Sequence, residues 1–194
     1  MKKMILVLLM VMVCSMAKGV TFIEGDRIIR DTVRVKINGE FRNVNIKRLI
    51  EMTQVIESSG GLNNFKGRIA KSSYQYEMAT VDHYKKLPLI KDIWNNIEDE
   101  LGRKLNPLKE EDAKYVTYII YFAKIYYHKN LLLNNKFFEE TGDVEWCIYK
   151  TLWNSSKGAS TYEKWVQRTA QYEAEKLLYA ELGSELYNSV SKIG

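Results

Sequence analysis

The stretch from Tyr115 to Tyr127 constrains the fold most strongly. Apolar and aromatic residues occupy every face of a helix there, except at Thr117 and Lys124. Pro107 marks a break before it, and the helix is predicted to run from Glu110 to His128. A helix that is apolar all round is normally the central helix of a domain, and this stretch is too short to span a membrane. We therefore expect the remaining elements to pack around it.

Most of the other elements are also predicted to be helical. The spacing of apolar residues and the positions of Ser, Gly and Pro predict helices over 46–57, 77–86, 89–101, 143–153 and 161–182. The segment from Thr32 to Ile46 differs, because Val33, Val35 and Ile37 alternate with charged residues before Asn38-Gly39, a dipeptide favoured in type I′ turns. Neither a repeat nor a linker divides the chain. The prediction is a mainly α-helical single domain with a small N-terminal β-hairpin.

Composition excludes several classes of protein. With 46% hydrophobic residues, 11 glycines and 2 prolines in 194 residues, the chain is neither disordered nor collagen-like. The net charge of +5 suits an anionic partner such as a nucleic acid, a membrane surface or an acidic cell-wall polymer. The basic residues form no run and no single-face stripe, so we predict no nucleic-acid partner.

The N-terminus has the pattern of a secretory signal peptide. Lys2 and Lys3 precede an apolar run that ends at Val13, and small residues follow, with Ala17 at the predicted cleavage site. Residues 1–17 are therefore predicted to be removed on export to the periplasm or cell envelope, with no transmembrane segment in the mature chain. Cys14 raises the question of lipidation, although a lipobox has a small residue where Val13 stands. Cleavage would leave Cys147 as the single cysteine, so no internal disulfide is expected.

Several kinds of catalytic site are not supported by the residues present. The two histidines, His83 and His128, and one mature cysteine are too few for a zinc site without an HExxH pattern. The chain has no GxSxG element and no phosphate-binding loop of the correct spacing. We predict neither a metal nor an organic cofactor.

Glu57 is the strongest candidate for a catalytic residue. Helical periodicity places it on the same face as Ile46 and Ile50, directed toward the interior. It also lies in the last turn of its helix, where the dipole disfavours a carboxylate. Both effects favour the protonated form, as a general acid requires. The alternative is a helix-terminal glutamate that bends out into solvent.

Three segments extend this hypothesis. The run Glu57-Ser58-Ser59-Gly60-Gly61 resembles the Glu-Ser-Gly-Gly signature of soluble lytic transglycosylases and goose-type lysozymes. The segment Ser72-Ser73-Tyr74-Gln75 resembles the family's Gly-x-x-Gln, and the following Tyr76-Glu77 with Ala79-Thr80 resembles a known variant. Trp153-Asn154 resembles its Tyr-Asn-x-Gly element, with Trp153 in place of tyrosine. The three occur in the family's order over about residues 45–170.

The resemblance implies a lysozyme-like domain over residues 46–194, after an N-terminal segment over 18–45 that contains the hairpin and could dock a partner. It implies a peptidoglycan substrate, with Glu57 acting first as acid and then as base and giving a 1,6-anhydro product. A secretion-apparatus or cell-wall protein is a further possible partner. The residues predicted to bind the glycan are Ser58, Ser59, Gln75, Tyr76, Glu77, Tyr118, Tyr121, Trp153 and Asn154.

The same residues also fit other functions. Hydrolysis by a lysozyme-type muramidase would require a second carboxylate, for which Glu77 is the candidate, although it also suits the first turn of the following helix. A non-catalytic cell-wall binding module would keep the fold without the reaction. The aromatic side chains of Tyr118 and Tyr121 also fit a purely structural role in the core.

Overall fold

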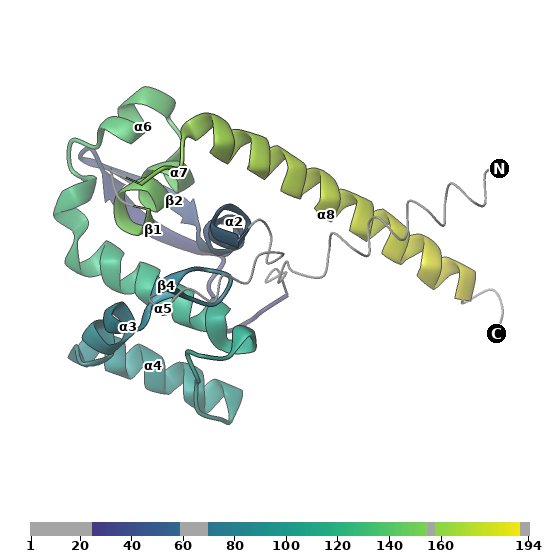
Figure 1. Cartoon of the computed structure of the whole chain (residues 1–194), viewed down its shortest axis with the longest axis horizontal. Coiled ribbons are helices and arrows are strands. Elements are labelled where there is room, and N and C mark those ends of the chain that lie inside the picture. Colours follow the sequence, from purple (N-terminus) through teal and green to yellow (C-terminus); the bar gives the residue numbers. More distant parts are fainter. Residues whose placement is uncertain (1–24, 59–69, 155–157, 191–194) are drawn as a thin grey trace.

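The computed structural model describes residues 25–58, 70–154 and 158–190 (Figure 1). The predicted signal peptide with Cys14, and the predicted site residue Ser59, lie outside these ranges. The described chain is mainly helical with a small antiparallel hairpin, as the sequence predicts. Among the described residues, none of the helices has the length and apolar character needed to cross a membrane.

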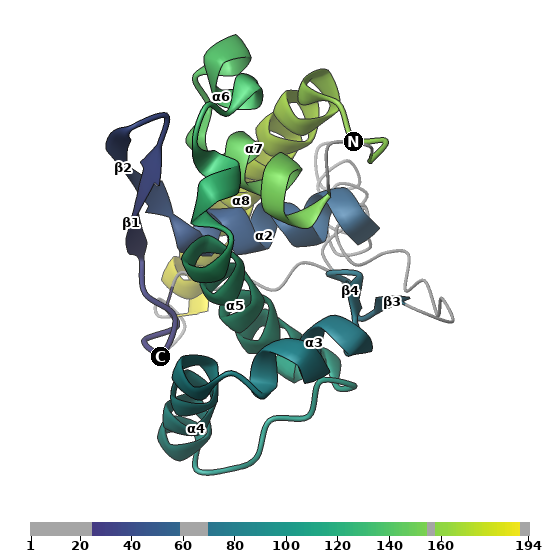
Figure 2. The same cartoon turned by 90° about the vertical axis from the view of Figure 1, so that its left-hand side faces the viewer.

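Helix α5 (Glu110–Tyr127) is the central element. Helices α2 (Ile46–Ser58), α3 (Met78–Lys85) and α4 (Pro88–Leu101) all contact it (Figure 2). Its middle turns are buried, which confirms the predicted central helix. Its last turn is less enclosed, because Tyr126 and Tyr127 are exposed. That turn borders a groove instead of being covered by another helix.

The predicted hairpin is present as strands β1 (Thr32–Ile37) and β2 (Glu40–Asn45). Asn38 and Gly39 have φ values of 48° and 87°, the left-handed conformations that a type I′ turn needs at both central positions. Val35, Ile37 and Val44 point into the core. The hairpin contacts α2, which follows β2 directly, and the later helix α7 (Val144–Ile148).

A compact group of short elements leads from α2 to α5. Strands β3 (Ala70–Lys71) and β4 (Tyr76–Glu77) form a two-residue ladder that precedes α3. Pro88 begins α4, where its missing N–H is tolerated, and Gly102 ends that helix at φ 65°. These elements pack against α3 and α5 on the side away from the hairpin (Figure 2).

The chain after α5 contains two short helices that the sequence pattern does not predict. A 3₁₀ turn, η1 (Lys129–Leu132), is followed by α6 (Lys136–Thr141), which begins at the capping residue Asn135. Both are too short to show a helical repeat of apolar residues. They bring the chain back past the hairpin, where the Asn38 amide donates to the Leu132 carbonyl at 3.0 Å.

The predicted continuous helix over 143–153 is divided in the structure. Helix α7 ends at Ile148, and a π-helical turn, η2 (Tyr149–Trp153), follows it directly. The Asn154 amide donates to the Tyr149 carbonyl at 2.9 Å, five residues back, which widens the turn. Helix α8 (Tyr162–Val190) then packs on α2 and continues beyond the body of the domain (Figure 1).

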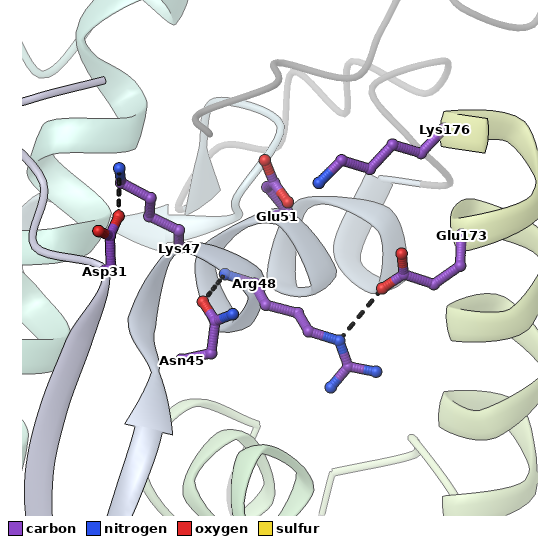
Figure 3. A pocket seen from close by; sticks show the side chains of 7 residues that line it. All are labelled: Asp31, Asn45, Lys47, Arg48, Glu51, Glu173 and Lys176. Atoms are coloured by element: carbon purple, nitrogen blue, oxygen red, sulfur yellow. Dashed lines mark hydrogen bonds and ion pairs between the residues drawn. The ribbon is translucent and has the colours of Figure 1, made fainter. Parts of the chain in front are cut away.

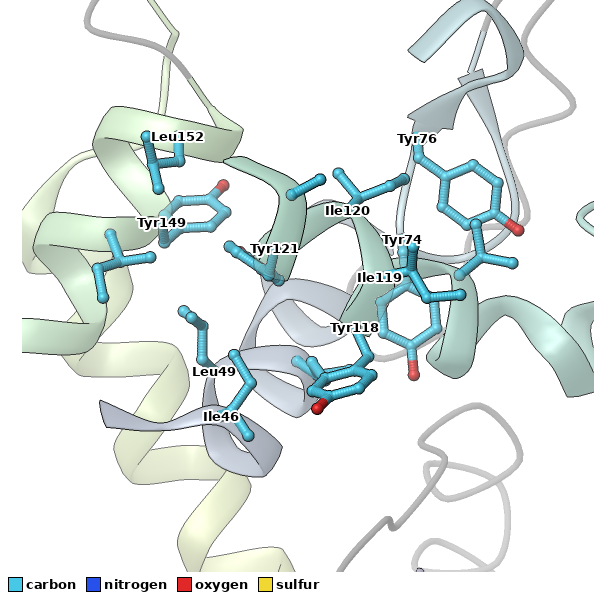
Figure 4. Close-up of a cluster of buried hydrophobic side chains, with 14 of the residues drawn as sticks. Ile46, Leu49, Tyr74, Tyr76, Tyr118, Ile119, Ile120, Tyr121, Tyr149 and Leu152 are labelled. Carbon is cyan, nitrogen blue, oxygen red and sulfur yellow. The ribbon is translucent and has the colours of Figure 1, made fainter. Parts of the chain in front are cut away.

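The core lies where α2, α5 and η2 meet. Figure 4 shows Ile46 and Leu49 of α2 facing Tyr121 of α5 and Tyr149 of η2. Each of these four side chains is at most 1% exposed. Both α2 and η2 pack on α5, and the Tyr149 hydroxyl of η2 reaches Glu57 at the C-terminal end of α2.

Candidate active site around Glu57

Glu57 lies in the last turn of α2, with a half-buried side chain. Its Oε1 accepts a hydrogen bond of 2.8 Å from the Tyr149 hydroxyl. Burial raises the pKa of Glu57, although hydrogen bonds from Tyr149 and Asn154 and the charge of Lys164 act in the opposite direction. The carboxyl is therefore turned inward and keeps its proton to a higher pH than an exposed glutamate.

The burial of α2 explains this inward orientation. All residues from Leu49 to Ile56 are buried, including the polar Thr53 and Gln54. The helix is thus enclosed on every side over its second half, and not only along the apolar face that periodicity predicts. Thr53 and Gln54 are accommodated by hydrogen bonds, at 2.6 Å to the Tyr121 hydroxyl and 2.8 Å to Ser73 Oγ.

Tyr149 contacts Glu57, and the sequence analysis did not select it as a site residue. Its hydroxyl lies between Glu57 Oε1 and Ser160 Oγ, which is 3.1 Å away. Burial, together with the neighbouring Glu57 charge, raises the pKa of Tyr149, so the hydroxyl stays protonated as a donor. One signal in the sequence could have found it. Tyr149 stands four residues before Trp153, about one helical turn from the position where the resembling family has tyrosine.

The π-helical turn also brings Asn154 to Glu57. The Asn154 side chain hydrogen-bonds to Glu57 and accepts from Lys150 Nζ at 2.9 Å. Lys150 is buried, which lowers its pKa, and it donates further to the carbonyls of Gly158 and Ser160 at 2.6 and 2.9 Å. Lys150 thereby connects the end of η2 to the segment that carries Ser160.

Gly158 is required by this packing. A Cβ at this position would collide with the side chain and the carbonyl of Asn154. Because Gly158 lies so close to Asn154, Lys150 Nζ can bond to the Asn154 side chain and to the Gly158 carbonyl together. A network of Lys150, Asn154, Tyr149 and Ser160 therefore holds the donors to Glu57 in place.

A small pocket of about 200 Å³ lies close to this network, although Glu57 is not one of its lining residues. Trp153 contributes to its lining, and the next residue in the chain, Asn154, hydrogen-bonds Glu57. The structure brings four of the predicted glycan-binding residues to this one pocket: Gln75, Tyr76, Glu77 and Trp153. Lys124, which the sequence analysis did not select, lies there too.

Tyr121 and Lys124 both contact the Trp153 ring that lines the pocket. The Trp153 ring stacks on that of Tyr121 with centroids 4.8 Å apart, and Lys124 Nζ lies 5.2 Å from the Trp153 ring centre. Burial lowers the pKa of Lys124 to about 8, while the nearby Glu77 charge acts to raise it. Lys124 also donates to the Leu152 carbonyl at 2.6 Å.

The loop that carries Gln75 has an unusual backbone. Ser72 and Gln75 have φ values of 62° and 58°, in the left-handed region that glycine occupies most readily. Gln75 Nε2 donates to the Ser72 carbonyl at 3.1 Å and closes the loop. The Tyr76 hydroxyl donates to the Pro107 carbonyl at 2.6 Å, so its ring is a fixed wall of the pocket.

The structure does not bring the other predicted residues into the pocket lining. Tyr121 is fully buried and supports Trp153 from within the core. Tyr118 is also buried, and its hydroxyl interacts with the Arg30 backbone, among residues that do not line the pocket. Ser58 is the last residue of α2. Its side chain and the whole of Ser59 are outside the described part of the chain.

A larger pocket, of about 440 Å³, lies between the start of α2 and α8 (Figure 3). Its charged groups pair with one another, Lys47 with Asp31 at 2.5 Å and Arg48 with Glu173 at 3.2 Å. Unlike the smaller pocket, it has none of the predicted glycan-binding residues in its lining. We therefore place the candidate chemistry at Glu57 and the smaller pocket.

Comparisons with known proteins do not assign this arrangement to a family. No family model matches the chain, and no match was found among curated proteins or solved structures. Within the described ranges, no cluster of three or more His, Cys, Asp or Glu side chains is arranged to hold a metal ion.

Proposed function

We propose that the protein is an exported peptidoglycan lytic transglycosylase with a lysozyme-like domain. It would cleave the β-1,4 bond between N-acetylmuramic acid and N-acetylglucosamine. The observation that carries the proposal is the inward-facing Glu57 carboxyl, whose pKa is raised by burial and whose close hydrogen-bond donors are the uncharged Tyr149 and Asn154. A general acid that works near neutral pH needs such an environment.

Two features of the site support the family resemblance on which this proposal also rests. The resembling Gly-x-x-Gln motif has glycine where this chain has Ser72, and Ser72 adopts a glycine-like φ of 62°. The family's Tyr-Asn element would supply a hydroxyl at Trp153, and Tyr149 supplies one to Glu57 from the preceding turn. Both departures from the motif are thus compatible with the same site geometry.

In the proposed reaction, protonated Glu57 donates its proton to the glycosidic oxygen. The bond from that oxygen to muramoyl C1 breaks, and positive charge develops at C1. The Glu57 carboxylate then takes the proton from the C6 hydroxyl, and O6 bonds to C1 to close a 1,6-anhydro ring. The proton gained equals the proton lost, so one carboxyl is sufficient and no water is consumed, unlike in two-carboxylate glycosidases.

The neighbouring residues take roles that follow from their chemistry. Gln75 offers a donor and an acceptor to an N-acetyl group, and half-buried Trp153 offers a ring face to a sugar. Tyr149 and Asn154 hold Glu57 and stabilise its charge after proton transfer. Ser58 and Ser59 remain proposed contacts to the glycan, beside Tyr76 and Glu77.

Mass spectrometry of soluble products from peptidoglycan sacculi tests the proposal. The protein lacking residues 1–17 is compared with its Glu57→Gln variant and with Glu77→Gln as the matched carboxylate control. We expect anhydro-muropeptides, lighter by one water than hydrolytic products, from the wild type and from Glu77→Gln, and none from Glu57→Gln.

Other outcomes would redirect the assignment. Hydrated reducing ends that are lost in both variants would indicate a two-carboxylate muramidase that uses Glu57 and Glu77. Absence of products from the wild type, with glycan binding unchanged in Glu57→Gln, would replace the enzyme by a cell-wall binding module.

A further inference from the structure

A groove of about 310 Å³ lies between the hairpin and the last turns of α5, and it shares no lining residue with the pocket beside Glu57. Its apolar surface is formed by Val33, Val35 and Phe41 from the hairpin and Phe122, Ile125 and Tyr126 from α5. Two of these side chains are large and exposed, Phe41 at 60% and Tyr126 at 55%. The groove therefore offers apolar surface that a partner could bury.

The rest of the lining is cationic. Arg34, Lys36 and Lys129 complete it, all three are exposed, and the lining contains no Asp or Glu. Arg34 and Lys36 lie over the Phe41 ring, at 4.5 and 5.9 Å from its centre. Among the described residues, none of the three forms an ion pair. The complementary ligand carries negative charge beside apolar groups.

The groove also runs along the edge of β1 that faces away from β2. Four consecutive β1 residues, 33–36, line it, and the β-ladder pairs Ile37 with Glu40 across a two-residue turn. In that register, the N–H and C=O groups of Val33 and Val35 point toward β2. Those of Arg34 and Lys36 point away from β2, to the open edge. No backbone hydrogen bond from another described segment reaches Arg34 or Lys36. An extended peptide could add a strand at this edge.

We propose that this groove docks an extended, acidic segment of a partner protein by strand addition to β1. Apolar side chains of the segment would bury Phe41 and Tyr126, and its carboxylates would pair with Arg34, Lys36 and Lys129. A second copy of this chain is a poor occupant, because pairing two β1 edges would bring the same cations together. The proposal goes beyond glycan cleavage and does not depend on it.

The test uses fluorescence anisotropy with a labelled peptide of repeated Glu-Val-Asp-Phe, and a Lys-Val-Lys-Phe peptide as the charge control. We expect the acidic peptide to bind and the basic peptide not to bind. The Arg34→Glu/Lys36→Glu variant should weaken binding at least tenfold. The matched variant Lys86→Glu/Lys91→Glu, at exposed positions after α3 and in α4, should leave binding unchanged.

Hydrogen exchange of the unmodified protein tests the strand pairing itself. A saturating concentration of acidic peptide should slow exchange of the Arg34 and Lys36 amides at least tenfold, with a smaller change at Val33 and Val35. Binding without this protection, or equal weakening by both charge-reversal variants, would overturn the proposal. It would also be overturned if phosphatidylglycerol vesicles, or a second copy of the chain, bound through Arg34 and Lys36 while the acidic peptide did not bind.

Discussion

Two regions of this protein bury carboxyl groups in opposite ways. At the end of α2, uncharged donors surround Glu57, and burial leaves its pKa raised. Between α4 and α5, Glu98 and Asp112 are even less exposed, at 5% and 0%. Burial acts to raise their pKa values too, but hydrogen bonds from Lys104 and Arg103, with help from backbone amides, outweigh it and lower them.

Uncharged donors suit Glu57 to proton transfer, whereas the charged donors at Glu98 and Asp112 suit these carboxylates to a structural role. Asp112 accepts from Arg103 Nη1 at 2.9 Å and from the Asn106 amide at 2.8 Å, so it ties the loop after α4 to the start of α5. Glu98 accepts from the Leu105 amide of the same loop at 3.0 Å and from Trp94 Nε1 within α4 at 2.9 Å. Such permanently ionised groups hold a fold together, whereas a group that gives up and regains a proton needs neutral partners.

Glu57→Gln should have the largest effect on activity and little effect on stability. Loss of a general acid lowers the rate by roughly 10²–10⁴-fold. A carboxyl with a raised pKa is most favourable to folding below its ordinary value of 4.5, and this contribution is lost as pH rises through the folded pKa. Urea unfolding above pH 4.5 should therefore show the variant equally or more stable, with less decline as pH rises than the wild type. A large loss of stability would assign Glu57 a structural role.

Asp112→Asn should show the reverse pattern. The change weakens the hydrogen bonds that buried Asp112 accepts from the Asn106 amide and from the exposed Arg103, which should cost about 1–3 kcal/mol of unfolding free energy. Because the pKa of Asp112 is lowered, its contribution is present above its ordinary value of 3.8 and is lost as pH falls through the folded pKa. The stability difference between the variant and the wild type, measured by urea unfolding, should thus shrink below pH 3.8, with the pH profile of cleavage unchanged.

Gly158→Ala tests whether the network behind Glu57 depends on close packing. The added methyl group collides with Asn154, and we expect a loss of about 1–3 kcal/mol in stability together with reduced cleavage. Gly25→Ala is the matched control, because a Cβ there meets nothing within 4 Å. Equal melting temperatures and activities for the two variants would contradict the importance of this contact.

Tyr149→Phe should have the smallest of these effects and the most specific one. It removes a hydrogen bond that favours ionised Glu57, so the pKa of Glu57 should rise further and the alkaline limb of the pH–rate profile should move to higher pH. A loss of about tenfold in rate is expected for one such interaction. Tyr118→Phe, which alters a buried hydroxyl near Arg30, is the control and should leave the limb in place.

The central helix, the hairpin and the inward direction of Glu57 follow from local sequence. The run from Tyr115 predicts α5 because a uniformly apolar helix has to be enclosed, and Asn38-Gly39 predicts the turn because both residues tolerate positive φ. Ile46 and Ile50 set the orientation of α2, and therefore of Glu57, through the helical repeat. These features depend on neighbours within a few residues along the chain.

The environment of Glu57 was decided by tertiary structure. Tyr149 is 92 residues away, and its hydroxyl reaches the carboxyl because α2 and η2 both pack on α5. A periodic pattern extends a regular helix from Asp143 to Trp153 and gives no sign of the π-turn that directs Asn154 inward. The same limit applies to Tyr118 and Tyr121, where sequence supplies an aromatic ring but not the side of α5 that neighbouring helices cover. Sequence alone thus predicted the inward direction of Glu57, whereas long-range packing selected the groups that hydrogen-bond its carboxyl.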